Sequence, residues 1–180
     1  MPYSRFFDDA ISKLKGERRY RVFADLERDA KAFPRAVWHG PDRIGEVVIW
    51  CSNDYLCMAR HPEVIEAMTA AAIRHGAGAG GTRNIAGTNH PLVELEAELV
   101  GLHGKEAALV FTSGWISNLA AISTIGDLLP NCLILSDEFN HNSMIEGIRR
   151  SKAQRQIFRH NDLAHLEELL RGAGRERAKL

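Results

Sequence analysis

Residues 107–158, AALVFTSGWISNLAAISTIGDLLPNCLILSDEFNHNSMIEGIRRSKAQRQIF, decide the fold class of this chain. Two continuous apolar runs, Ala107–Phe111 and Cys132–Leu135, have the length and composition of strands buried on both faces of a parallel sheet. A polar turn and a helical pattern follow each run, the second over Ser143–Arg150, and Gln156–Phe158 predicts a third strand. Strands that alternate with helices indicate an α/β fold, with a mixed, mostly parallel sheet covered by helices on both faces.

Helices flank this stretch on both sides. On the C-terminal side, Asp162–Leu170 carries a helical apolar stripe, and Ala178–Leu180 predict the opening of another strand. On the N-terminal side, Pro62 opens one helix, and a leucine stripe that ends at Gly104 predicts a second. The helix–strand alternation therefore continues beyond the deciding stretch.

The first 55 residues have a different character. Apolar positions at helical spacing among charges over residues 4–31 predict one or two amphipathic helices, and Glu46–Cys51 predicts a short strand. We expect an N-terminal helical arm with a short strand over residues 1–55, followed over residues 56–180 by the first part of a larger domain. That domain is expected to be incomplete, since a sheet of two or three strands is small.

The composition excludes several classes of protein. The 180 residues carry 23 Lys plus Arg and 23 Asp plus Glu, so no basic excess favours nucleic acid or a membrane surface. Three scattered cysteines and the lack of an apolar leader segment are typical of a cytoplasmic protein. Asp137 and His141 are too few ligands, at the wrong spacing, to predict a metal site.

Four polar clusters lie where predicted helices and strands end, which is where α/β proteins place ligand sites. Each also has a purely structural interpretation: a turn at Cys51–Leu56, a flexible connector at Gly76–Thr88, a tight strand–helix turn at Ser113–Trp115 and a helix cap at Ser136–Ser143. The polar residues embedded in the glycines of the second cluster favour a binding loop. The free N–H groups of a helix start in the third cluster suit a phosphate, with a tight turn that holds no ligand as an equal alternative. In the fourth, a histidine suits ring stacking, acid–base chemistry or capping.

In this order and spacing, the clusters resemble those of the α-oxoamine synthase family of fold-type I pyridoxal-phosphate enzymes. The resemblance rests on WCSNDYLCMARHP, GAGAGGTRNIAGT, LHGKEAALVFTSGW and LSDEFNHNSMIEGIR, with RYRVFADLERDAKAFPRA and IFRHNDLAHLEELL at either end. It implies pyridoxal 5'-phosphate as cofactor and condensation of glycine with succinyl-CoA to 5-aminolevulinate, CoA and carbon dioxide, the first step of tetrapyrrole and heme synthesis. It also implies a homodimer with active sites at the interface. Two alternatives stay open for the function of the chain. It is part of another α-oxoamine synthase that uses a different acyl-CoA, or it is a truncated, non-catalytic partner chain.

The resemblance implies a role for individual residues. His141 is expected to stack on the cofactor ring, while Ser113 and the backbone of Gly114 and Trp115 hold its phosphate. The expected substrate contacts are Asn53 for the glycine carboxylate, Arg21, Thr82 and Asn84 for the succinyl carboxylate, and Ser136 and Arg155 for the CoA substrate. A guanidinium with a hydroxyl is a matched carboxylate receptor, and such a receptor rejects an acyl chain that lacks the carboxylate.

The chain departs from the family pattern in three respects. Arg155 stands where lysine is common, which keeps the charge, and Trp115 replaces other residues. The family's Schiff-base lysine, its pyridine-pairing aspartate and a second histidine are expected beyond Leu180, because none of Lys105, Lys152 and Lys179 sits in a matching motif. No catalytic residue is therefore assigned within the chain, and we expect the 180 residues alone to be an inactive, truncated form.

Overall fold

The computed structural model describes residues 3–180, which fall into two compact units divided between Gly78 and Ala79. No helix among residues 3–180 combines the length and apolar character needed to cross a bilayer. The units do not test the predicted division of the chain at residue 55, which stays a prediction.

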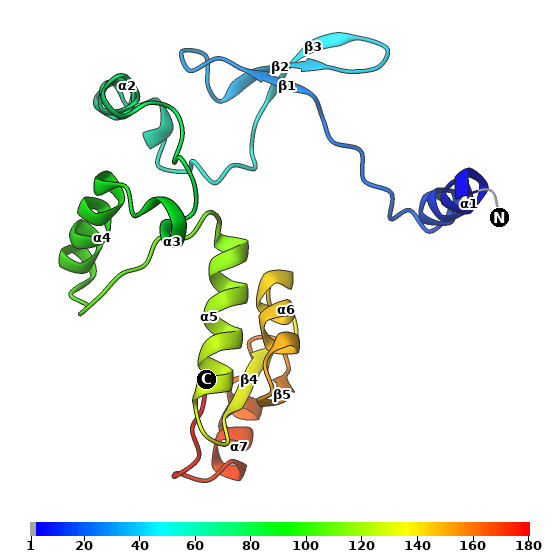
Figure 1. Ribbon diagram of the computed structural model, residues 1–180. Helices are drawn as coiled ribbons and strands as arrows, with labels where there is room; N and C mark the ends of the chain where they lie inside the picture. The colour runs from blue at the N-terminus through cyan, green and yellow to red at the C-terminus, as the bar shows by residue number, and fades with distance from the viewer. Residues whose placement is uncertain (1–2) are drawn as a thin grey trace. The chain divides into compact units, whose positions relative to one another are not determined.

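The first unit combines helices with a small antiparallel sheet (Figure 1). Its elements are α1 (Tyr3–Gly16), β1 (Leu26–Arg28), β2 (Arg35–His39), β3 (Ile44–Val48), a 3-10 turn η1 (Met58–Arg60) and α2 (Pro62–His75). The sheet order is β1-β2-β3, with Leu26 opposite Trp38 and Arg35 opposite Val48. Pro62 at the first turn of α2 confirms the predicted start of that helix.

The predicted helical arm is right over α1 and wrong beyond it. Gly16 is the last helical residue, and Arg18 adopts a left-handed φ of 55°, so the helix does not resume toward Leu26. Residues 26–28 instead join the sheet, and Ala36 opposite Arg28 is buried at 4% exposure. The strand predicted at 46–51 begins earlier, at Ile44, and ends at Val48.

The second unit contains the α/β part of the chain (Figure 1). Its elements are α3 (Arg83–Ala86), α4 (His90–His103), α5 (Gly114–Leu128), β4 (Leu133–Asp137), α6 (Asn142–Arg150), β5 (Gln154–Phe158) and α7 (Leu163–Gly172). Gly104 ends α4 in the left-handed conformation, which glycine adopts without a Cβ penalty. Asp162 begins α7 by accepting the His165 N–H at 2.9 Å.

β4 is a central parallel strand. On one side it pairs with β5, Leu133 lying opposite Gln154 and Asp137 opposite Phe158. On the other side the Leu133 N–H donates to the Ala178 carbonyl at 2.9 Å, and the Leu180 N–H donates to the Leu133 carbonyl at 3.0 Å. Ala178–Leu180 therefore meets β4 through an isolated parallel bridge, Leu133 opposite Lys179, where the sequence predicted the opening of a strand. The α/β fold class is confirmed.

The strand predicted at 107–111 does not form. These residues have no ladder partner within residues 3–180, and the Val110 N–H donates instead to the Glu96 carboxylate at 2.7 Å. An apolar run has strand geometry only where a neighbouring strand takes up its backbone groups.

Helices α5 and α6 pack closely at two glycines. A Cβ at Gly147 of α6 would lie 3.0 Å from the Asn118 carbonyl oxygen of α5, and one at Gly126 of α5 would lie 3.1 Å from Cβ of Ser151, the residue that caps the end of α6. The small core beside them consists of Cys132, Ile134 and Ile148, with Ile122, Leu129 and Ala153 around it. This packing sets the spacing between the starts of the two helices.

Candidate functional site

The start of α5 presents free backbone donors. Ser113 is its N-cap: the Ser113 hydroxyl accepts the Ile116 N–H at 3.3 Å, and the Ser113 carbonyl accepts the Ser117 N–H at 3.0 Å. The Gly114 and Trp115 N–H groups are the next two at a helix start, where no intrahelical acceptor is available. A Cβ at Gly114 would meet no atom of another segment within 4 Å, so no other described segment packs against this glycine. The arrangement suits an anion such as a phosphate.

His141 begins α6 and is held in one orientation. Its Nδ1 accepts the Ser143 N–H at 3.2 Å and lies 2.7 Å from the Ser143 hydroxyl. The same hydroxyl accepts from Asn118 Nδ2 of α5 at 3.0 Å, and Ser143 is completely buried. Because a backbone N–H always donates, Nδ1 is the acceptor nitrogen, and the proton of the neutral ring lies on Nε2.

The His141 ring is exposed although its orientation is fixed. Its neighbour is the Trp115 indole, edge-to-face at a centroid distance of 5.9 Å and an interplanar angle of 77°. An exposed, oriented imidazole next to the α5 start gives a flat stacking surface beside an anion site. The structure thus brings Ser113, Gly114, Trp115 and His141 together.

Ser136 and Arg155 line a shared cavity of about 240 Å³ with Ile145, Ile148 and Arg149. Ser136 is 5% exposed, and its hydroxyl accepts from Asn140 Nδ2 at 2.9 Å. β5 places Arg155 opposite Ile134 of the neighbouring strand. The predicted pair is therefore adjacent, with Arg155 the more accessible partner.

The loop at the carboxyl end of β4 is fixed by one acid. Asp137 Oδ1 accepts the Phe139 N–H at 2.8 Å and lies 2.9 Å from His160 Nδ1, and Asp137 Oδ2 accepts the Asn161 N–H at 3.2 Å. The Phe139 N–H, followed by His160, holds the pKa of the Asp137 carboxyl below its usual value. This network joins the ends of β4 and β5 and supports the loop that carries His141.

Thr82 and Asn84 are exposed on either side of Arg83, at the start of α3. The Thr82 carbonyl accepts the Ile85 and Ala86 N–H groups, at 3.0 and 2.9 Å, and neither the Thr82 nor the Asn84 side chain has a hydrogen-bond partner within residues 3–180. Arg83 points its guanidinium to Glu96 instead, with Nη2 2.9 Å from Oε1. The two flanking side chains are thus available to a ligand, and the arginine is occupied.

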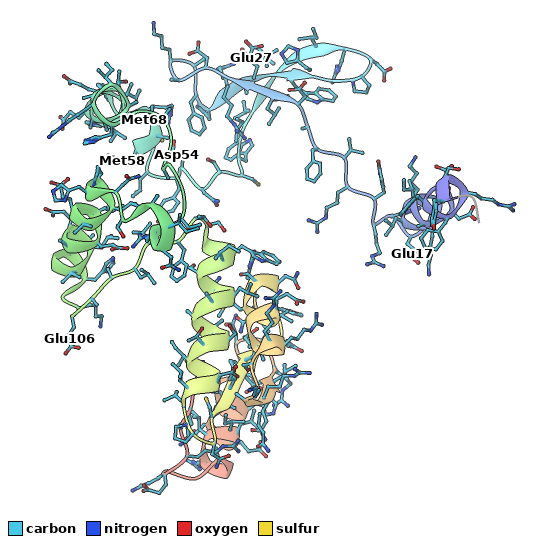
Figure 2. The ribbon with its side chains drawn as sticks, in the orientation of Figure 1. Glu17, Glu27, Asp54, Met58, Met68 and Glu106 are labelled. Atoms are coloured by element: carbon cyan, nitrogen blue, oxygen red, sulfur yellow. The ribbon has the colours of Figure 1, made fainter. Side chains whose placement is uncertain are left out.

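In the first unit, Asn53 lines a cavity of about 670 Å³ with Cys51, Ser52, Phe33 and Arg60. Its neighbour Asp54 shapes the loop (Figure 2): the Asp54 N–H donates to Ser52 Oγ at 3.0 Å, and Asp54 Oδ1 accepts the Ala59 N–H at 3.1 Å. These bonds form the turn that the sequence alone suggested, and they leave the Asn53 side chain at the cavity wall.

Arg21 lies in the irregular segment between α1 and β1 and is exposed, without an ion pair among residues 3–180. The roles predicted for Arg21 and Asn53 stay predictions, as do those of the residues in the second unit.

Three contributors were missed by sequence reasoning: Asn118, Ser143 and Glu96. Ser143 has a local signal, because a serine near a helix start commonly makes backbone bonds. Asn118 and Glu96 have none, since their partners lie 25 and 13 residues away. Ser143 and Asn118 orient the predicted His141, and Glu96 binds Arg83, which lies between the predicted Thr82 and Asn84.

Comparison with known proteins places this geometry in context. The aminotransferase class I and II family model matches residues 45–180. The chain is 67% identical over 180 residues to 5-aminolevulinate synthase of Bradyrhizobium diazoefficiens and 57% identical over 181 residues to 5-aminolevulinate synthase 2 of Cereibacter sphaeroides, covering 100% of this chain in both cases. It spans 44% of the length of each of these relatives.

Solved structures agree on the fold. A serine palmitoyltransferase from S. paucimobilis, with PLP and myriocin bound, matches with a TM-score of 0.80 and 29% identity over 99% of this chain and 45% of that one. The enzyme of Sphingomonas wittichii matches with a TM-score of 0.77 and 25% identity, over 98% of this chain and 43% of that one.

Proposed function

Since the chain belongs to the aminotransferase class I and II family, we propose that it forms the first part of an enzyme that condenses glycine with succinyl-CoA to 5-aminolevulinate, releasing CoA and carbon dioxide. The relatives named above support this reaction. The observation that carries the proposal is the oriented imidazole of His141 beside the open start of α5.

The residues present fit pyridoxal 5'-phosphate. The Gly114 and Trp115 N–H groups and Ser113 would hold its phosphate at the helix start, where these donors have no intrahelical acceptor. His141 would lie against its ring. When bound, this cofactor supplies an electron sink for the carbanion of the amino acid.

The other polar residues singled out above would select the substrates. Thr82 and Asn84, with Arg21, would bind the terminal carboxylate of the succinyl group, because hydroxyl, amide and guanidinium groups are good carboxylate donors. Asn53 would donate to the glycine carboxylate. Arg155, beside Ser136, would meet a phosphate-bearing CoA as a positive charge.

We further propose a homodimer in the cytoplasm. Large apolar side chains that stay exposed in the arm, such as Phe23 at 91%, support burial against another surface. The exposed, unpaired Arg21 in the same segment is consistent with a role at such a surface.

The decisive experiment is turnover by the complete gene product. With glycine, we expect 5-aminolevulinate from succinyl-CoA and at least about a hundredfold lower kcat/KM with acetyl-CoA, which lacks the carboxylate, or with pimeloyl-CoA. Preferred turnover of acetyl- or pimeloyl-CoA would assign another α-oxoamine synthase reaction. No turnover of any of the three, with no cofactor bound, would indicate a non-catalytic chain and refute the proposal.

A substitution tests the cofactor site itself. His141→Ala removes the stacking surface, and we expect the complete gene product to lose cofactor absorbance on gel filtration where the parent protein keeps it. His103→Ala is the matched control, because His103 is an exposed histidine at the end of α4 with no side-chain bond within residues 3–180. Equal cofactor retention by the two variants would contradict the assignment of His141.

A further inference from the structure

Glu96 of α4 joins two segments that carry different parts of the proposed site. A single oxygen, Oε1, accepts from Arg83 Nη2 at 2.9 Å and from the Val110 N–H at 2.7 Å. Arg83 Nη2 also approaches the Val110 carbonyl at 3.4 Å. Glu96 and Arg83 are partly buried, with side-chain exposures of 18% and 31%.

Glu96 links the segment around Arg83 to the segment around Val110, and neither segment has strong structural support of its own. Arg83 stands between Thr82 and Asn84 in a four-residue helix, which is too short to be stable by itself. Val110 lies three residues before Ser113, in the apolar run that has no strand partner within residues 3–180. Both segments therefore depend on a side chain from α4 for their position.

The charge state of Glu96 suits this task. Its bond from Arg83, followed by that from the Val110 N–H, holds the pKa of the Glu96 carboxyl below its usual value, so it is ionised at neutral pH. An ionised carboxylate makes stronger bonds to a guanidinium and to an amide than a neutral acceptor does.

We propose that Glu96 is a positioning residue, which holds the Thr82–Asn84 loop in register with the segment leading into the start of α5 and so sets the recognition of the acyl substrate's terminal carboxylate. This inference rests on the proposed function, since it assumes that Thr82 and Asn84 face that carboxylate. It assigns Arg83 to structure: its guanidinium is committed to Glu96, and the carboxylate is left to the residues on either side.

The test compares Glu96→Gln and Glu96→Ala with Glu98→Gln and Glu98→Ala in the complete gene product. Glu98 is an exposed acid on the same helix with no ion pair or side-chain hydrogen bond within residues 3–180, so its substitutions reproduce the chemical change without the junction. Glu96→Gln keeps the shape and an acceptor for Val110, which covers the case in which Glu96→Ala does not fold.

We expect Glu96→Ala to raise KM for succinyl-CoA about tenfold, with kcat and the KM for glycine nearly unchanged, because a displaced binding loop costs substrate recognition. The preference for succinyl-CoA over butyryl-CoA should fall by a similar factor. Glu96→Gln should lie between the parent and Glu96→Ala, and both Glu98 variants should match the parent. Hydrogen exchange of the substrate-free protein should be faster in residues 82–86 and at Val110 in the Glu96 variants only.

Two results would overturn the proposal. The first is that the Glu96 variants have the same hydrogen-exchange rates and the same KM for succinyl-CoA as the Glu98 variants. The other is a fall in kcat together with a similar rise in the KM for succinyl-CoA and in the KM for glycine, which would indicate general damage to the enzyme. If the parent protein makes no 5-aminolevulinate, the proposed function fails, and the exchange comparison still decides whether Glu96 positions the two segments.

Discussion

Replacement of Gly147 by alanine tests whether the close approach of α5 and α6 is a requirement of the fold. A Cβ at this position would lie 3.0 Å from the Asn118 carbonyl oxygen, 3.0 Å from Ile122 Cβ and 3.3 Å from the Leu119 carbonyl oxygen. None of these atoms is the end of a rotatable side chain. The two helices must therefore separate to accept the methyl group.

The expected magnitude follows from two opposing effects. Alanine is favoured over glycine inside a helix by about 1 kcal/mol. Overpacking against atoms that cannot rotate away costs about 1–3 kcal/mol. Gly147→Ala is therefore expected to lower the free energy of unfolding by about 0–2 kcal/mol.

Gly101→Ala in α4 is the matched control, because a Cβ at Gly101 would meet nothing within 4 Å. This variant should be more stable than the parent by up to about 1 kcal/mol. Urea unfolding of the complete gene product, followed by circular dichroism, measures both variants. The difference between them isolates the overpacking cost of about 1–3 kcal/mol.

The site should respond as well. Asn118, whose carbonyl is displaced, also donates through Nδ2 to the Ser143 hydroxyl that orients His141. Gly147→Ala should therefore bind pyridoxal phosphate less tightly than Gly101→Ala does. If Gly147→Ala stabilises the protein as much as Gly101→Ala and binds the cofactor equally well, the reasoning about this helix contact is wrong.

Three further predictions concern the core, the orientation of His141 and the stability of the fold in acid. Leu133→Ala removes a side chain of β4 with 1% exposure and should lower the free energy of urea unfolding by about 2–5 kcal/mol. Leu163→Ala, at 76% exposure, should change it by no more than about 0.5 kcal/mol. Equal costs would contradict the placement of the core. Ser143→Ala takes the hydroxyl from between His141 and Asn118 and should weaken cofactor binding in a fluorescence titration, unlike Ser123→Ala, whose hydroxyl bonds only to its own helix. The His165 N–H, followed by Arg159, lowers the pKa of Asp162 below its ordinary value of 3.8, so the carboxylate stabilises the fold fully above pH 3.8 and this contribution is lost as pH falls through the lowered pKa. Asp162→Asn should make acid unfolding less steep in that window by circular dichroism, and a curve identical to that of the parent would contradict this role of Asp162.

The sequence predicted best those elements whose signals are local. Pro62 at the start of α2, Gly104 after α4 and Asp162 before α7 each act within one helical turn, and each marks a helix end in the structure. The strand–helix alternation from β4 to α7 was likewise read from apolar runs of typical length.

The parts that were missed depend on partners distant in the chain. β1 and β2 are short and carry charged residues, so only their pairing, Leu26 opposite Trp38, identifies them as strands. The apolar run at 107–111 had the composition of a strand and lacked a partner among the described residues. Within the site, the four loop clusters were visible in the sequence, whereas the contacts that orient them, from Glu96 and Asn118, were not.

The central position of β4 has a consequence for the order of folding. Its pairing with β5 joins Leu133 to Gln154, 21 residues apart, whereas its other edge joins Leu133 to Lys179, 46 residues apart. Closing the longer loop costs about 0.7 kcal/mol more chain entropy. During synthesis, β4, α6 and β5 also leave the ribosome well before Lys179. The parallel sheet is therefore expected to grow outward from β4, with β5 docking first and the segment Ala178–Leu180 pairing with the other edge afterwards.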